Sequence, residues 1–215
     1  MALVLKKLYL GYFWLFDELA DPRLKDSFLV SSPLVAILIP TIYLYFVFAW
    51  GPQFMKNRKP YKLKKLIIVY NISQILVNAA MLPYAISLIF KLDWNCARID
   101  YSQSPEALLT LRLHIGFYLL KIYDLLDTVF FILRKSTRQV NFLHVYHHWG
   151  MILGTFITLN FAGGGELVWT GIINAIIHTV MYSYYLLSIV NKDWKGNFKF
   201  KKFLTQIQLV SIYLV

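Results

Sequence analysis

The stretch FLVSSPLVAILIPTIYLYFVFAW, residues 28–50, contains no charged side chain. It exceeds the roughly 20 apolar residues that a helix needs to cross the hydrocarbon core of a membrane. Helices in lipid tolerate proline, so we expect Pro33 and Pro40 to kink this segment without ending it. Across the chain 58% of the residues are hydrophobic and 15% are charged, whereas soluble domains carry about 25% charged residues. The sequence therefore predicts an all-α, polytopic integral membrane protein.

Further apolar segments follow the first one. We expect membrane spans at about 28–50, 66–90, 112–133, 143–160 and 167–190, and a sixth span that begins at residue 203. At about 1.5 Å per residue, 203–215 is too short to cross a core of about 30 Å, so we expect the sequence to stop inside a helix that a longer protein would complete. We interpret residues 1–27 as an amphipathic lumenal lead-in at the membrane interface rather than a cleaved signal peptide. Residues 28–215 form the predicted transmembrane domain.

The basic residues indicate how these spans are oriented. Fourteen of the 22 lysines and arginines lie in three loops, at 51–65, 134–138 and 191–202, and eight of the 11 acidic residues lie on the opposite side. The positive-inside rule places the three basic loops in the cytoplasm. We therefore expect a lumenal amino terminus, and we attribute the net charge of +11 to membrane topology rather than to nucleic-acid binding.

Two local patterns carry little weight. Asn71-Ile72-Ser73 matches a glycosylation acceptor, but it lies within a predicted span, and an acceptor must be exposed on the lumenal side. Cys96 is the single cysteine and lies in the predicted outer loop 91–111. The chain therefore has no internal disulfide and no cysteine pair of the zinc-binding kind.

Three of the five histidines lie in the stretch His144-Val145-Tyr146-His147-His148, where the fourth predicted span begins. At helical spacing the three imidazoles share one face, and Tyr146 points away from it. A polar helix start at a membrane surface is the simplest interpretation. Three histidines on one face that enters an apolar segment favour a functional one, in which their partner is a metal, a carboxylate or an acyl group.

The third predicted span carries four polar side chains within about 120° of arc: Lys121, Asp124, Asp127 and Thr128. Each charge at this depth costs at least about 2.5 kcal/mol, so a polar interior or a function must retain it. One interpretation is an ion pair between Lys121 and the aspartates that holds two helices together. The other is a carboxylate that fixes the tautomer of an imidazole on the next helix. The short connecting loop makes spans three and four antiparallel neighbours.

The fifth predicted span repeats this pattern with one polar stripe that holds His178 near mid-membrane. A lone buried histidine is often only hydrogen-bonded to another helix, but its neighbours on the stripe favour a polar-lined cavity that opens to the cytoplasm. Acyl-CoA, with a charged head and a long apolar tail, suits such a cavity. The stripe contains Asn174, His178, Met181, Tyr182 and Tyr185, and span six adds Thr205 and Gln208, one turn apart.

Four motifs, in this order, resemble those of the very-long-chain fatty acid elongases of the endoplasmic reticulum. Asp124 stands where that family usually has glutamate, and Ser211 stands where a second glutamine is common. The resemblance implies one peripheral span beside a six-helix barrel around an acyl tunnel, incomplete in this sequence. The motifs are Lys121-x-x-Asp124-x-x-Asp127-Thr128, Gln139-x-x-Phe142-Leu143-His144-x-Tyr146-His147-His148, Asn174-x-x-x-His178-x-x-Met181-Tyr182-x-Tyr184-Tyr185 and Thr205-x-x-Gln208.

The resemblance implies condensation of a long-chain acyl-CoA with malonyl-CoA to a 3-oxoacyl-CoA two carbons longer, with release of CO2 and CoA and with no metal or further cofactor. Cys96 is expected across the membrane from the cytoplasmic entrance, so the cysteine acyl-enzyme of soluble ketoacyl synthases is excluded and a histidine must substitute as nucleophile or base. Our hypothesis is that His147 accepts the acyl group and that His178 handles the malonyl group.

The remaining site residues have supporting roles in this hypothesis. A carboxylate of Asp124 or Asp127 orients His147, and His144 and His148 shape the site or relay protons. Asn174 stabilises negative charge that develops near His178. The expected substrate-binding residues are Lys121, Thr128, Gln139, Asn174, Tyr182, Tyr185, Thr205 and Gln208.

Two other functions stay open at this point. A di-iron membrane desaturase or hydroxylase also uses His-x-x-His-His, but such a site draws on about eight histidines, more than the five in this chain. A lipid or solute transporter is disfavoured because no inverted repeats or glycine-broken half-helices are visible. The resemblance further implies an endoplasmic reticulum membrane location, with membrane lipids and other elongation-cycle enzymes as partners. The oligomeric state stays open, and a homodimer is among the alternatives. Nothing in the motifs indicates the preferred acyl chain length.

Overall fold

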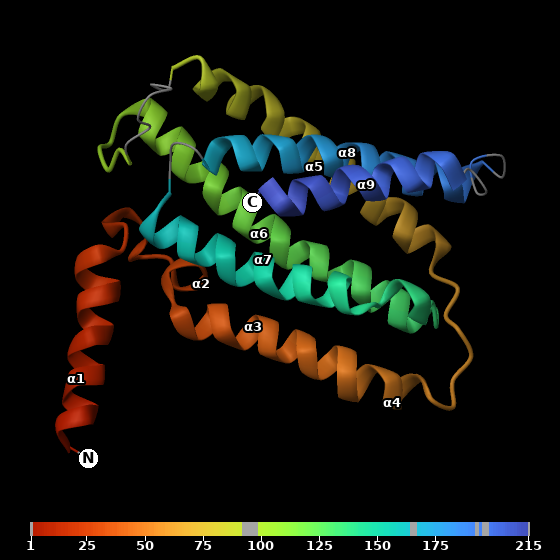
Figure 1. Cartoon of the computed structure of the whole chain (residues 1–215), viewed down its shortest axis with the longest axis horizontal. Coiled ribbons are helices and arrows are strands. Elements are labelled where there is room, and N and C mark those ends of the chain that lie inside the picture. Colours follow the sequence, from red (N-terminus) through yellow and green to blue (C-terminus); the bar gives the residue numbers. More distant parts are fainter. Residues whose placement is uncertain (1, 92–98, 164–166, 192–193, 195–197, 215) are drawn as a thin grey trace. The chain divides into compact units, whose positions relative to one another are not determined.

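A computed structural model describes residues 2–91, 99–163, 167–191, 194 and 198–214, and the regular secondary structure in these ranges is entirely helical (Figure 1). Three described stretches are long and apolar enough to cross a membrane: Pro33–Met55, Lys64–Ile89 and Val168–Val190. The prediction of an all-α, polytopic membrane protein is confirmed. The chain divides into two compact units. The first contains residues 1–59 and 99–164, and the second contains residues 60–98 and 165–215.

The first unit is built around three long helices. α7 packs beside both α3 and α6. A short loop joins α6 to α7, and the two helices run in opposite directions (Figure 1). The helices are α1 (Ala2–Phe13), α2 (Phe28–Ser31), α3 (Pro33–Tyr45), α4 (Gly51–Met55), α6 (Pro105–Leu133) and α7 (Phe142–Phe161), with π-turns η1 (Trp14–Leu19) and η3 (Phe46–Trp50) and 3-10 turns η2 (Pro22–Leu24) and η4 (Thr137–Gln139).

The first span differs from the predicted segment at both ends. Ser32 has an extended backbone with ψ of 117°, so α2 ends before it and Pro33 becomes the first residue of α3. Proline lacks the N–H group that the first helical turn leaves unpaired, and it therefore begins a helix more readily than it bends one. Pro40 does lie inside α3, as expected. At the other end α3, η3 and α4 continue without a break as far as Met55.

Local capping explains where α6 and α7 begin. The Ser104 hydroxyl accepts a hydrogen bond from the N–H of Ala107 at 3.2 Å, Pro105 follows as the first helical residue, and Glu106 lies in the first turn. These are strong helix-start signals, so α6 begins well before residue 112, where the apolar span was predicted to start. The Asn141 side chain caps α7 by accepting from the N–H of His144 at 2.9 Å.

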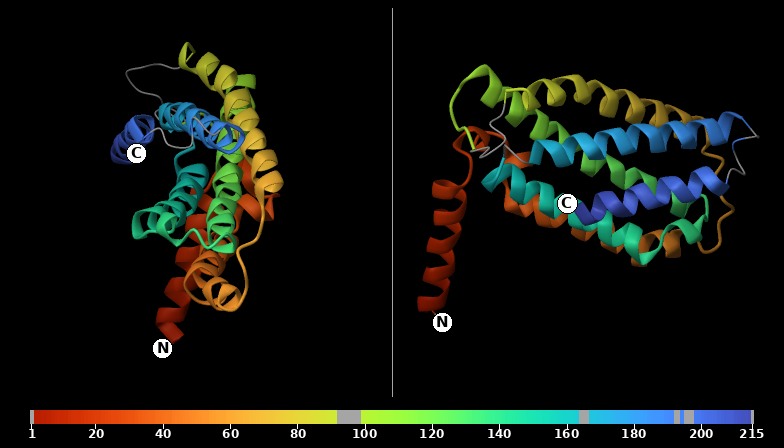
Figure 2. Two further views of the ribbon diagram at one scale, coloured as in Figure 1. Left: turned by 90° about the vertical axis from the view of Figure 1, so that its right-hand side faces the viewer. Right: turned by 45° about the horizontal axis from the view of Figure 1, so that its top comes forward.

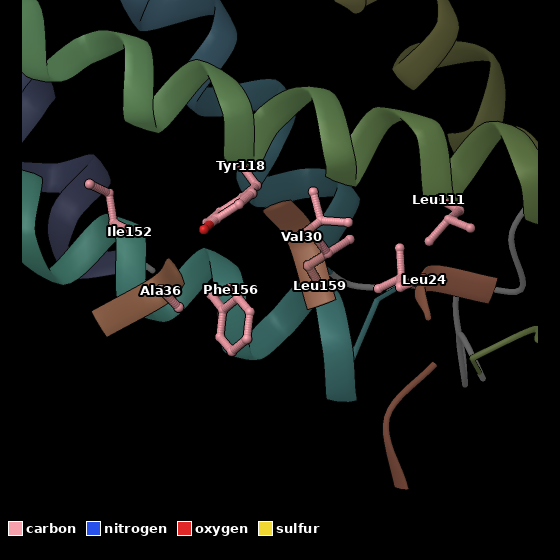
Figure 3. Packing of buried hydrophobic residues seen from close by; sticks show 8 residues of the cluster. All are labelled: Leu24, Val30, Ala36, Leu111, Tyr118, Ile152, Phe156 and Leu159. Carbon is pink, nitrogen blue, oxygen red and sulfur yellow. The ribbon is translucent and has the colours of Figure 1, made fainter. Parts of the chain in front are cut away.

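The apolar core of the first unit joins the lead-in to the two long helices. Tyr118 on α6 and Ile152 on α7 are both fully buried in this core (Figure 3). Inside a membrane such burial stabilises the fold through close packing of the side chains rather than through removal of apolar surface from water. The core contains Leu24, Val30, Ala36, Leu111, Tyr118, Ile152, Phe156 and Leu159.

The side chain of Arg23 connects the lead-in to the segment that precedes α6. Its Nε and Nη2 donate to the Asp21 carboxylate at 2.9 and 2.6 Å, and its Nη1 donates to the carbonyls of Asp100 and Ser102, each at 3.0 Å. The N–H of Asp21 in turn donates to the carbonyl of Asn160 in the last turn of α7 at 2.8 Å. The hydrogen bonds to Asp21 raise the pKa of Arg23. Residues 20–24 thus belong to the packed unit, whereas α1 before them is exposed.

At Gly51 the helix backbone lies so close to neighbouring atoms that a residue with a side chain would not fit. A Cβ atom at this position would lie 2.7 Å from the Phe46 carbonyl oxygen and 3.1 Å from Cγ2 of Ile132. We expect Gly51→Ala to lower the free energy of unfolding by about 1–3 kcal/mol, because the backbone oxygen cannot move aside. Thermal unfolding in one detergent measures this change.

The matched control for this variant is Gly154→Ala in α7, where a Cβ atom would meet nothing within 4 Å. Alanine is favoured over glycine inside a helix by up to about 1 kcal/mol. We therefore expect Gly154→Ala to keep or raise the unfolding temperature. Equal effects of the two substitutions would contradict the steric explanation.

The second unit contains α5 (Lys64–Ile89), α8 (Leu167–Val190) and α9 (Phe198–Leu214), with α5 and α8 packed side by side (Figure 2). α9 begins within the segment that was predicted to be a basic loop. Asn71 is 1% exposed inside α5, which agrees with setting aside its glycosylation pattern. Cys96 lies outside the described residues, as do Gly164 and Gly165 of the predicted outer turn and Lys192, Asp193 and Lys195 of the predicted third basic loop.

Candidate active site

The three clustered histidines occupy the first two turns of α7, half-buried on one face. The ring centroids of His144 and His148 are 4.4 Å apart, and those of His147 and His148 are 5.6 Å apart. Tyr146 is 56% exposed and lies away from them. The cluster is therefore close enough for two imidazoles to act on one substrate group, and it keeps one side accessible.

Beside the histidines, α6 carries a buried ion pair. Nζ of Lys121 lies 2.9 Å from Oδ2 of Asp124, and each side chain is 2% exposed. The Nζ atom also lies 4.8 Å from the ring centroid of Phe117. Lys121 and Asp124 thus form an ion pair within one helix, one turn apart, and that this pair also holds two helices together stays a prediction. His147 and His148 lie close enough to Lys121 and Asp124 to interact electrostatically with their charges.

A chain of hydroxyl groups reaches the histidines from α3. The hydroxyls of Tyr43 and Thr128 are 3.1 Å apart, and Oγ1 of Thr128 lies 2.8 Å from Nε2 of His144. Thr128 is 0% exposed and Tyr43 is 4% exposed. The partner of this imidazole is therefore a hydroxyl, where sequence analysis expected a carboxylate for one of the histidines. That a carboxylate orients His147 stays a prediction.

Tyr43 escaped sequence analysis because it lies in the apolar span 33–55, where a tyrosine is an ordinary hydrophobic residue. Only the packing of α3 against α7 brings its hydroxyl to Thr128. Asp127, the second predicted carboxylate, is buried at 9% exposure. Gln139 is exposed in η4, so the structure does not bury it with the cluster.

Metal-ligating side chains are not gathered in the described part of the chain: no group of three histidine, cysteine, aspartate or glutamate residues there is arranged to hold an ion. The expectation of a metal-free site stays a prediction.

In the second unit, the predicted stripe on α8 is largely buried. Asn174, His178 and Tyr182 are 6%, 8% and 0% exposed. The Tyr182 ring meets His178 edge-on at 5.7 Å and Tyr185 at 6.1 Å. These side chains form a continuous polar and aromatic row along α8. From α9, Nε2 of Gln208 donates to Sδ of Met181 at 2.7 Å.

Thr205 does not join this row. Its hydroxyl donates to the carbonyl of Lys201 at 3.0 Å within α9, and the residue is exposed. Of the two predicted residues of α9, only Gln208 is brought to α8.

α5 contributes a buried hydrogen-bonded row that sequence analysis missed. Nδ2 of Asn78 donates to Oε1 of Gln74 at 3.2 Å, Nε2 of Gln74 donates to the Tyr70 hydroxyl at 2.8 Å, and that hydroxyl lies 3.3 Å from the hydroxyl of Tyr182. Polar residues at steps of four in an otherwise apolar span were the available signal, because they lie on one helix face. The row supports Tyr182, which packs against His178.

Comparison with known proteins agrees with the motifs. Residues 28–215 match the ELO: GNS1/SUR4 family. The chain is 39% identical to rat very long chain fatty acid elongase 7 over 204 residues, 94% of this chain and 72% of the relative. It is 39% identical to mouse very long chain fatty acid elongase 1 over 206 residues, 94% of this chain and 74% of the relative.

A more distant animal relative gives the same result. Very long chain fatty acid elongase 7 of Drosophila melanogaster is 35% identical over 209 residues, which is 96% of this chain and 64% of the relative. The matches thus cover nearly all of this chain and about two thirds to three quarters of each relative. This chain belongs to the GNS1/SUR4 family of very long chain fatty acid elongases.

Proposed function

We propose that the protein is a very-long-chain 3-oxoacyl-CoA synthase, an acyltransferase of fatty acid elongation. It condenses a long-chain acyl-CoA with malonyl-CoA and releases CO2, CoA and a 3-oxoacyl-CoA that is two carbons longer. Family membership supports the reaction class. The observation that carries the proposal is the half-buried face of α7, where three imidazoles lie beside a buried lysine–aspartate pair.

In the first half-reaction His147 acts as the nucleophile. A ring nitrogen of its neutral imidazole attacks the thioester carbonyl, the carbon–sulfur bond breaks, and CoA leaves as the thiol after it takes up a proton. The product is an acyl-imidazole. Lys121 interacts electrostatically with His147. Its ammonium group stabilises the negative charge that develops on the carbonyl oxygen.

In the second half-reaction malonyl-CoA supplies the carbon nucleophile. Loss of CO2 leaves an enolate, whose carbon attacks the acyl carbonyl. The new carbon–carbon bond forms as the carbon–nitrogen bond to His147 breaks, and the departing imidazolate takes up a proton from water, which restores the neutral imidazole. We assign the malonyl group to His178 and Asn174, which are buried on one row of α8, because an amide and an imidazole can donate hydrogen bonds to the enolate oxygen.

The direct test is a condensation assay with membranes that contain the full-length protein, long-chain acyl-CoA and labelled malonyl-CoA. We expect a labelled 3-oxoacyl-CoA two carbons longer than the acyl substrate. A lipid carrier makes no such product, and a desaturase or hydroxylase needs O2 and bound iron rather than malonyl-CoA. Stoichiometric iron together with a malonyl-independent product would refute the proposal.

The buried row on α5 gives a prediction for the second unit. Tyr70→Phe removes the hydroxyl that links Gln74 to Tyr182. Because it leaves a buried amide without that partner, we expect the free energy of unfolding to fall by about 1–3 kcal/mol. Condensation with malonyl-CoA is expected to slow as well, since Tyr182 packs on His178.

The matched control on the same helix is Tyr84→Phe, because Tyr84 is 58% exposed. Exposed substitutions usually change the free energy of unfolding by less than about 0.5 kcal/mol. Thermal unfolding in detergent and the condensation rate compare the two variants. A loss of stability for Tyr84→Phe as large as for Tyr70→Phe would contradict a specific role of the row.

The protein is a multi-pass membrane protein, and its finer placement belongs to this proposal. The distribution of lysine and arginine supports a lumenal amino terminus and a cytoplasmic entrance to the site. Elongation in the endoplasmic reticulum membrane, beside the enzymes that reduce and dehydrate the 3-oxoacyl product, follows from the proposed reaction, because its product needs those steps to become a saturated chain.

A further inference from the structure

The hydroxyl chain between α3 and α7 restricts where His144 carries its proton. Thr128 differs from other threonines of the long helices. Thr41, Thr110 and Thr155 each donate to the backbone carbonyl four residues back. Within the described residues the Thr128 hydroxyl has only Tyr43 and His144 as hydrogen-bond partners. Its single hydrogen must therefore point to one of these two side chains.

The hydrogen bonds from Tyr43 through Thr128 to His144 can run in two directions, and these two arrangements are not equivalent. If Thr128 donates to Tyr43, then Nε2–H of His144 donates to Thr128, and the phenolic hydrogen of Tyr43 has no acceptor in the described structure. Tyr43 is 4% exposed, and an unsatisfied buried donor is costly. If Tyr43 donates to Thr128 instead, Thr128 donates to Nε2 of His144 and every hydrogen in the chain has an acceptor. The second direction is favoured.

We propose that Tyr43, acting through Thr128, holds His144 as the neutral tautomer with its proton on Nδ1. A neutral imidazole has one in-plane lone pair, and in this tautomer the Thr128 hydroxyl occupies it. His144 then offers an N–H donor to a substrate and cannot serve as nucleophile or general base. Tyr43 is a positioning residue, because its hydroxyl touches Thr128 rather than the reacting groups.

The catalytic meaning of this tautomer rests on the proposed function. With the lone pair of His144 engaged, covalent chemistry falls to His147 or His148. The ring of His148 is the nearer of the two to His144, with the ring centroids 4.4 Å apart. The tautomer itself is a property of the folded protein and can be measured without any substrate.

Long-range 1H–15N correlation spectra of the full-length, 15N-histidine-labelled protein identify the protonated ring nitrogen of each neutral histidine. The signals of His144 are assigned from their loss in His144→Asn. At about pH 8, where ordinary histidines are neutral, we expect His144 to carry its proton on Nδ1. We expect Tyr43→Phe to give a mixture of tautomers, because Thr128 is then free to donate to a backbone carbonyl and accept from Nε2–H.

The matched control is Tyr45→Phe, two residues away on α3 and 64% exposed, which should keep the wild-type tautomer. Thr128→Ser, which retains the hydroxyl, should keep it too, whereas Thr128→Val should lose it. A proton on Nε2 in the wild-type protein, or an unchanged tautomer in Tyr43→Phe, overturns the proposal. Unfolding temperatures of all variants identify any that fold incorrectly, and Thr128→Ser against Thr128→Val then decides.

Rate measurements separate this inference from the proposed function. We expect Tyr43→Phe to lower kcat of condensation about three- to tenfold, the size expected for one buried neutral hydrogen bond, and to leave KM unchanged. Tyr45→Phe should leave both unchanged. A changed tautomer with an unchanged kcat overturns the catalytic role of Tyr43. A wild-type protein that makes no 3-oxoacyl-CoA overturns the proposed function, while the spectra still decide the tautomer.

Discussion

His147→Gln is expected to abolish condensation, with a loss of rate of roughly 10⁴-fold or more, as for removal of other enzymic nucleophiles. Glutamine keeps a polar side chain of similar length but has no nucleophilic nitrogen. The half-buried ring of His147 lies within 5.6 Å of the His148 ring, between centroids. Because His147 is half-buried rather than fully buried, we expect the fold to accommodate glutamine at this position.

Intact-protein mass spectrometry distinguishes a lost nucleophile from a lost binding site. Incubation with acyl-CoA in the absence of malonyl-CoA should add one acyl group to the wild-type protein and none to His147→Gln. The control is His114→Gln, since His114 bonds the carbonyl of Thr110 within α6 at 2.9 Å and is outside the cluster. An acyl adduct that persists in His147→Gln and maps to His148 would move the nucleophile to that residue.

Lys121→Met is expected to lower the free energy of unfolding by about 3–5 kcal/mol, the usual result of removing one partner of a buried ion pair. The substitution leaves the Asp124 carboxylate 2% exposed without its 2.9 Å partner. Methionine fills the volume of the lysine stem, so the loss reports the missing positive charge beside Asp124 rather than a cavity. Condensation should fall with it, because the same lysine stabilises charge near His147.

The double variant Lys121→Met with Asp124→Leu separates stability from catalysis. Since both charges are gone, most of the stability should return, while condensation stays low. Lys59→Met provides the control, because Lys59 is exposed and its replacement should change little. Thermal unfolding in one detergent compares these three variants with the wild type and with the single variant Asp124→Leu. If the two single losses simply added in the double variant, the ion pair would not be the source of the effect.

The three stretches that are long and apolar enough to cross a membrane and the histidine cluster could be predicted because they depend on local rules. Apolar runs of the length of 167–190 leave few alternatives to a membrane helix, and His144, His147 and His148 share a face on any helix. Ser104 and Glu106 also predict the start of α6 at Pro105, whereas the apolar pattern begins later in the sequence.

The hydrogen-bond partners could not be predicted because they depend on packing between helices. The spacing of the residues allowed Lys121 to form an ion pair within α6 or with another helix. The ion pair between Lys121 and Asp124 is visible only in the structure. Tyr43 and Tyr70 look like ordinary aromatic residues of apolar spans. Their hydroxyls gain roles from Thr128 and Tyr182, which lie far from them in the sequence.

The π-turn η3 allows the length of the first span to differ by one residue among relatives. Its wider turn accommodates one residue more than an α-helical turn. Tyr43 before it and Met55 after it nevertheless both pack in one core with Ile132. A relative with one residue fewer between these positions can run as straight α-helix and still present both side chains to α6. Alignments of the family should therefore place a one-residue gap within 46–50, where evolution can insert or delete without moving the active site.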